Sequence, residues 1–128
     1  MTIEFCAGQR WTYRAPVGFQ SSRLVIGAMV AFAADDSVLC CMVTNAPRRG
    51  PDGTIERVTI AFLPMTVEAL RQSVVELDGI ADIDAAFVAA YEVWREDPRG
   101  LAAFSVPFEG FLDVLIARQM AAIIGVAV

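Results

Sequence analysis

The sequence predicts an α+β fold in which a small, curled, barrel-like antiparallel sheet of four or five strands packs against two or three helices. Three observations support this fold class: alternation of apolar and polar residues near the N-terminus, a following strand that is apolar on both faces, and a change to helical spacing after residue 62. We expect one domain, residues 1–128, with the sheet mainly in 8–62 and the helices mainly in 66–124.

The first two strands are predicted to form a hairpin. In Gln9–Arg14, Trp11 and Tyr13 point to the same face, as in a strand with one covered side. In Ser22–Phe32 both faces are apolar, which is typical of a strand at the centre of a sheet. Gly27 indicates a bulge where this strand bends. The residues expected to share one face of it are Leu24, Ile26, Ala28, Val30 and Phe32.

Three later segments are expected to complete the sheet. Val38–Thr44 and Thr54–Phe62 have the composition of strands, and Pro64 is expected to stop the second of them. Asn45–Gly53 is rich in Pro, Gly, Asn and Asp, so we interpret it as a mobile loop. Leu101–Val106 is a candidate fifth strand that would pair with the first strand and close the barrel.

Helical spacing begins at Thr66, a plausible N-cap, and the first helix is expected to continue to Leu77 and end at Asp78 and Gly79. A second helix is predicted to start near Asp82 or Ile83, and to end over residues 97–100. A third is predicted to start at Pro107 and continue to about Ile123. The second helix carries an aromatic stripe at i, i+4 and i+7, formed by Phe87, Tyr91 and Trp94.

Composition excludes several classes of chemistry. All ten basic residues are arginine, so the chain offers no histidine base or zinc ligand and no lysine for a Schiff base or a phosphate-binding loop. A net charge of −5 disfavours a nucleic-acid partner. Three cysteines without C-x-x-C spacing, no secretory signal and no long apolar span predict a cytoplasmic protein outside the membrane. We expect no cofactor and no enzymatic activity.

The apolar content of 56% is high for one small core. Either the core is dense and rich in alanine, or part of the apolar surface is exposed and binds a partner. The third helix has the widest apolar face, which predicts a homodimer interface. The same class of function, action through a protein interface, also includes an acidic binder of another bacterial protein, such as an immunity-type factor. The residues expected at this interface are Phe108, Phe111, Leu112, Leu115 and Ile116.

A different class of function is a small-ligand-binding module. Trp11 and Tyr13 on a strand, with Tyr91 and Trp94 on a helix, are candidates to line an aromatic cleft, although such stripes more often pack a core. Two loop arginines are candidates to bind a carboxylate or phosphate, and two arginines at the other end of the hairpin are candidates to join them. These residues are Arg48 and Arg49, with Arg14 and Arg23.

Two further sets of residues favour structural roles. Asp78, Asp82 and Asp84 lie close in sequence, but their spacing does not match a calcium loop, and acids before a helix complement its dipole. We therefore predict no metal site. Cys40 and Cys41 face opposite sides of a strand and have no histidine partner, so neither is expected to act as a nucleophile.

Several sequence blocks, in order, resemble a family of small, mostly hypothetical bacterial proteins. The blocks are an F-x-x-G-Q-x-W-x-Y opening, an S-x-L-x-I strand, an L-P-x-[ST]-x-x-A-L-x-x-S-V helix start, a Y-x-x-W pair and an F-[ST]-[VI]-P segment. The resemblance covers most of the chain and implies no assigned activity or catalytic residue. The matching residues are Phe5, Gly8, Gln9, Trp11, Tyr13, Ser22, Leu24, Ile26, Leu63, Pro64, Thr66, Ala69, Leu70, Ser73, Val74, Tyr91, Trp94, Phe104, Ser105, Val106 and Pro107.

Overall fold

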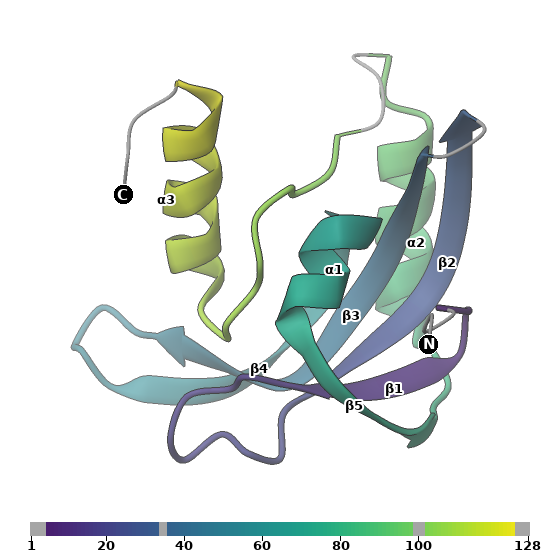
Figure 1. Ribbon diagram of the computed structural model, residues 1–128. Helices are drawn as coiled ribbons and strands as arrows, with labels where there is room; N and C mark the ends of the chain where they lie inside the picture. The colour runs from purple at the N-terminus through teal and green to yellow at the C-terminus, as the bar shows by residue number, and fades with distance from the viewer. Residues whose placement is uncertain (1–4, 34–35, 99–101, 125–128) are drawn as a thin grey trace.

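The computed structural model describes residues 5–33, 36–98 and 102–124, and within them it contains a five-stranded antiparallel sheet and three helices (Figure 1). The α+β class is therefore confirmed. The strands are β1 (Gln9–Tyr13), β2 (Arg23–Ala33), β3 (Asp36–Arg49), β4 (Ile55–Thr66) and β5 (Val74–Ile80), in the order β4-β3-β2-β1-β5. The helices are α1 (Val67–Ser73), α2 (Ala85–Arg95) and α3 (Leu112–Ile123).

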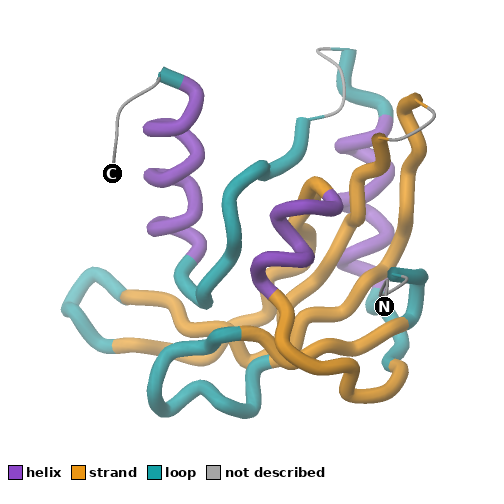
Figure 2. Tube along the Cα trace, in the orientation of Figure 1, coloured by secondary structure: helices purple, strands orange, loops and turns teal. Residues whose placement is uncertain are grey.

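The sheet is open, with β4 and β5 at its two edges, so the prediction of a barrel-like sheet is wrong (Figure 2). The free edge of β1 is occupied by β5, which leaves no room there for residues 102–106. Instead, Phe104 bridges the outer edge of β4: its N–H donates to Pro64 O at 2.9 Å, and Thr66 N–H donates to Phe104 O at 2.9 Å. Leu101, the first residue of the predicted fifth strand, lies outside the described residues.

Gly27 forms the bulge that the sequence predicted in β2. Ile26 pairs with Cys41 and Ala28 with Cys40, so Gly27 is an extra residue in the ladder. An extra residue reverses the inward and outward alternation beyond it. As a result Ala28 and Val30 pack on the opposite face from Leu24 and Ile26, which corrects the predicted single face. The side chain of Phe32 lies outside the described part of the chain.

The β3–β4 hairpin is longer than predicted. The expected loop at residues 45–53 is mostly strand, and only residues 50–54 form the turn. Pro47 is tolerated because β3 pairs with β4 alone beyond Thr44, so the strand is an edge there. Pro64 does not stop β4, because β4 is itself an edge strand and does not need every N–H for a ladder.

The predicted first helix divides into a short helix and a strand. Thr66 is confirmed as the N-cap, since its Oγ1 accepts a hydrogen bond from Ala69 N at 3.1 Å. The helix ends at Ser73, and Val74–Ile80 then pairs with β1 instead of continuing to Leu77 as helix. Pairing with an unsatisfied strand edge outweighs the helical spacing of the apolar residues.

The other two helices begin at caps set by local sequence. Asp84 caps α2 by accepting from Phe87 N at 2.9 Å, close to the predicted start. The predicted stop of α2 includes residues 99–100, which lie outside the described residues. α3 begins at Leu112 and not at Pro107, because the intervening chain turns inward and Phe108 N donates to the buried Ser73 Oγ at 2.8 Å.

Both faces of the sheet are covered. On one face α1, Phe108 and Leu115 pack over Trp11, Leu24 and neighbouring residues of the central strands. On the other face Phe87 of α2 packs against Val25, Cys40 and Met42. Figure 1 shows α1 and α2 on opposite sides of the sheet, with α3 standing beside it. No helix among the described residues has the length and apolar character needed to cross a membrane.

Replacing Gly27 by alanine should destabilise the fold. A Cβ at this position would lie 2.6 Å from Phe87 Cε1, so the buried ring of α2 would have to move. Overpacking of this kind costs about 1–3 kcal/mol, measurable by urea unfolding. In a Phe87→Leu background, which frees space at the contact, the cost of Gly27→Ala should fall by about half or more. An equal cost in both backgrounds would contradict the assigned contact.

Candidate functional site

The four aromatic residues predicted to share a cleft lie on opposite faces of the sheet. Trp11 and Tyr13 are 2% and 6% exposed and belong to the core under α1, whereas Tyr91 and Trp94 pack on the α2 side. Trp11 Nε1 donates to Gln9 Oε1 at 3.1 Å, and the Tyr13 hydroxyl lies 2.7 Å from Ser22 Oγ. Desolvation raises the pKa of Tyr13. Because the two aromatic pairs belong to clusters on opposite faces of the sheet, the structure does not bring them into one cleft.

Tyr91 and Trp94 are half-buried and belong to a second aromatic cluster. Their rings contact Phe62 of β4, with centroid distances of 6.4 Å for Tyr91 and 5.5 Å for Trp94. Trp94 Nε1 donates to Ala102 O at 2.7 Å. Trp94 also lines an apolar pocket of about 300 Å³ between the ends of α2 and α3, whose walls include Phe62, Phe104 and Ile123. None of the described residues that line this pocket is charged, so they do not define a ligand.

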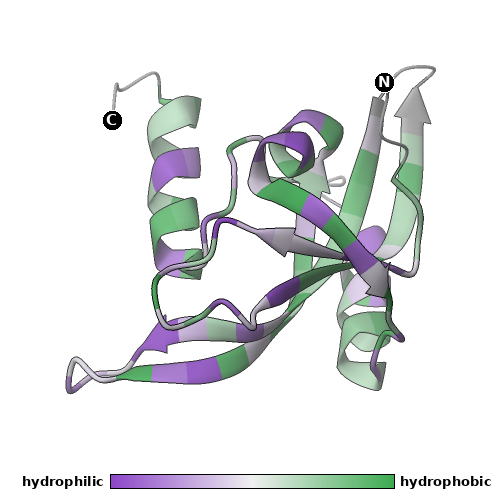
Figure 3. Cartoon of the chain, turned by 60° about the horizontal axis from the view of Figure 1, so that its bottom comes forward, coloured by the Kyte–Doolittle hydropathy of each residue, from purple (hydrophilic) through white to green (hydrophobic). Residues whose placement is uncertain are grey.

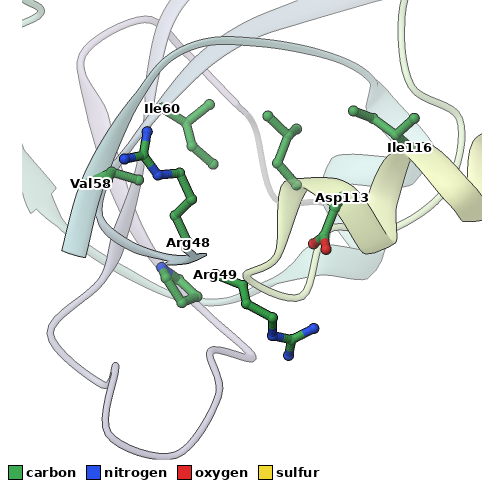
Figure 4. Close-up of a pocket in the computed structure, with 8 residues that line it drawn as sticks. Arg48, Arg49, Val58, Ile60, Asp113 and Ile116 are labelled. Carbon is green, nitrogen blue, oxygen red and sulfur yellow. The ribbon is translucent and has the colours of Figure 1, made fainter. Parts of the chain in front are cut away.

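Arg48 and Arg49 lie at the end of β3 and line a different pocket, of about 280 Å³, between the β3–β4 hairpin and the start of α3 (Figure 4). Arg48 Nη2 is 2.8 Å from Glu56 Oε2, and the Arg49 guanidinium lies 5.2 Å from the centroid of the Phe111 ring. Asp113 contributes an acidic group. The remaining lining residues are Pro47, Val58, Ile60, Leu112 and Ile116.

The other two arginines considered for the same anion site are engaged elsewhere. Arg14 Nη1 donates to Gln72 O at 2.5 Å, and Arg23 Nε lies 2.6 Å from Asp78 Oδ2. Arg10 also approaches Asp78, at 3.3 Å. The hydrogen bond from Arg23 is the main cause that lowers the pKa of Asp78 below its ordinary value. Arg10 and Arg23 thus tie β1 and β2 to the edge strand β5, whereas Arg14 contacts α1.

Two of the three acidic residues singled out in the sequence, Asp78 and Asp84, have structural roles. Asp78 pairs with two arginines, and Asp84 caps α2, so neither is placed with Asp82 around a common point. Among the described residues, no group of three His, Cys, Asp or Glu side chains is positioned to hold a metal ion.

The predicted interface on α3 is only partly available. Phe108 and Leu115 are 0% and 2% exposed in the chain's own core, which rules them out as surface residues. Phe111 and Leu112 are half-buried, and Ile116 is exposed at the wall of the arginine pocket. The sequence interpretation missed another face of α3, whose signal is the i, i+3, i+6, i+7, i+10 spacing of apolar residues. That face, here called the outer face of α3, consists of Val114, Ala117, Met120, Ala121 and Ile124.

Cys40 and Cys41 are both fully buried, one on each face of the sheet. Desolvation raises the pKa of Cys40 to about 12 and raises that of Cys41 as well, so both thiols stay protonated at neutral pH. A protonated, inaccessible thiol is not a nucleophile. Cys6 is the exposed cysteine.

Comparisons with protein-family models, curated proteins and solved structures gave no match for this chain. The geometry described above is therefore the basis for any functional argument.

We expect a thiol reagent such as Ellman's reagent to label one cysteine per folded chain at about pH 8, just below the ordinary thiol pKa of about 8.5. The labelled residue should be Cys6, because Cys40 and Cys41 are buried and protonated. All three should react after unfolding in denaturant, which serves as the control. Labelling of Cys40 or Cys41 in the folded protein, at a rate near that of Cys6, would contradict the closed packing of the central strand.

Proposed function

We propose that the protein is non-enzymatic and acts through a protein–protein interface on the outer face of α3, with a second copy of the chain as the partner. The supporting observation is that α3 is apolar around most of its circumference and yet is covered on only one side. Figure 3 shows α3 mostly green, interrupted by purple bands. A helix that is hydrophobic on all sides is normally buried.

The exposed fractions on α3 are large for apolar side chains. Val114 is 41% exposed, Met120 56% and Ile124 67%, and all three belong to the outer face. Leu115 is the buried residue of the helix, so the chain itself covers little of α3. An exposed apolar patch on this scale is typical of an interaction surface.

A second copy fits this face better than a basic partner does. The five residues of the outer face of α3 are uncharged, and two charged residues adjoin them. Asp113 lies one turn before Ala117, and Arg118 lies one turn after Val114 and pairs with Glu109 at 2.7 Å. Most of the net charge of −5 is therefore carried elsewhere on the chain. A twofold symmetric dimer pairs the same patch of both subunits, and an apolar patch can do so without bringing like charges together. Ala117 and Ala121, in the middle of the face, would let two helices approach closely.

Light scattering after size exclusion, together with native mass spectrometry, should show a dimer that Met120→Arg weakens by at least roughly 100-fold. An unpaired charge buried in an apolar interface costs about 3 kcal/mol or more. Val93→Arg is the matched control, since Val93 is an apolar residue of α2 that is 75% exposed and lies off α3. It should leave the dimer intact.

A wild-type chain that remains monomeric at high concentration would contradict the proposed homodimer. A dimer that is insensitive to Met120→Arg would place the interface elsewhere on the molecule. A stable complex with a different protein that Met120→Arg disrupts, without any homodimer, would keep the surface and change the partner.

A further inference from the structure

The pocket between the β3–β4 hairpin and α3 combines an apolar floor with charges of both signs at its rim. Val58 and Ile60 of β4, and Leu112 and Ile116 of α3, provide the apolar side chains. Its volume of about 280 Å³ lies near the lower limit of ordinary ligand sites, so the ligand must be small.

Arg49 is the cation that this rim offers to a ligand. Arg48 is neutralised by Glu56, 2.8 Å away, whereas Arg49 makes no ion pair within the described part of the chain. The Arg49 guanidinium rests over the ring of Phe111 at 5.2 Å, a contact that orients it without neutralising its charge. A guanidinium held in this way is suited to a carboxylate.

Asp113 is the anion of the rim. It comes from the first turn of α3, across the pocket from the hairpin. Its Oδ1 accepts from Val114 N at 2.9 Å, and in residues 5–33, 36–98 and 102–124 it forms no ion pair. A simple carboxylate ligand would meet this negative charge, whereas a ligand that also carries an ammonium group would be attracted by it.

From these features we propose that the pocket binds a small zwitterion with an apolar side chain, of the class of a free aliphatic amino acid. Its carboxylate pairs with Arg49, its ammonium group pairs with Asp113, and its side chain packs on Ile60 and Ile116. Figure 4 shows Arg49 coming from the hairpin and Asp113 from α3, on the same side of the apolar side chains, with the Arg49 guanidinium directed away from Ile60 and Ile116. The site adjoins the outer face of α3 at Asp113, but none of the five residues of that face lines the pocket, and the proposal does not rest on dimer formation.

The test uses three probes that share one branched side chain: L-leucine, 4-methylpentanoate, which lacks the amine, and 3-methylbutylamine, which lacks the carboxylate. Methyl resonances of Val58, Ile60, Leu112 and Ile116 are followed by NMR as each probe is added. Leucine should shift these resonances with a Kd of about 1 mM or tighter. Each analogue should bind at least roughly 10-fold more weakly, because it loses one charge-assisted hydrogen bond.

Two variants of the protein assign the charges. Arg49→Met should weaken leucine binding at least roughly 10-fold and remove the remaining affinity for 4-methylpentanoate. Asp113→Asn should weaken leucine binding by a similar factor and leave 4-methylpentanoate bound as well as before, or better. The controls are Arg71→Met and Asp82→Asn, which remove equal charges at exposed positions outside the pocket. They should leave all three affinities unchanged.

Three outcomes would overturn the proposal. The first is that leucine leaves the pocket methyl resonances unshifted in the folded protein. The second is that 4-methylpentanoate binds as tightly as leucine, which would indicate a plain carboxylate site. The third is that leucine binds but Arg49→Met or Asp113→Asn has no more effect than its control.

Discussion

Cys40 and Cys41 are neighbours in the chain, face opposite sides of the sheet and are both fully buried, so the central strands require cover on two sides. Two of the three helices are needed to cover the two faces of the sheet. α2 covers one face and α1, with Phe108, covers much of the other. The third helix, α3, contributes Leu115 and part of Leu112 to the core and leaves most of its other apolar residues at the surface. The outer face of α3 is exposed because other parts of the chain already cover most of both faces of the sheet.

The Gly27 bulge makes this double cover possible. By adding one residue to β2, it turns Ala28 and Val30 toward the α2 face, while Leu24 and Ile26 face α1. Because it lacks a Cβ, Gly27 also lets Phe87 approach the strand backbone. One glycine therefore sets both the direction of the side chains beyond it and the depth at which α2 packs.

Local signals in the sequence predicted the local structure well. The alternation around Trp11, the cap at Thr66 and the bulge at Gly27 each depend on neighbouring residues, and each is confirmed. Val74–Ile80 was misassigned because its spacing fits a helix, and only the free edge of β1 makes it a strand. For the arginine pocket, the sequence indicated only Arg48 and Arg49, because the other residues that line it come from segments far apart in the chain. The placement of aromatic residues on opposite faces likewise depends on topology.

Hydrogen exchange at low and high protein concentration tests most directly whether α3 is the part of the fold left for a partner. Amides of β2 and β3 should exchange slowest at both concentrations, because they lie between the two cores. Amides of α3 should exchange quickly in dilute solution and become more protected as concentration rises. Exchange in α3 that is slow in dilute solution and independent of concentration would show that the chain covers this helix by itself, and would contradict the account.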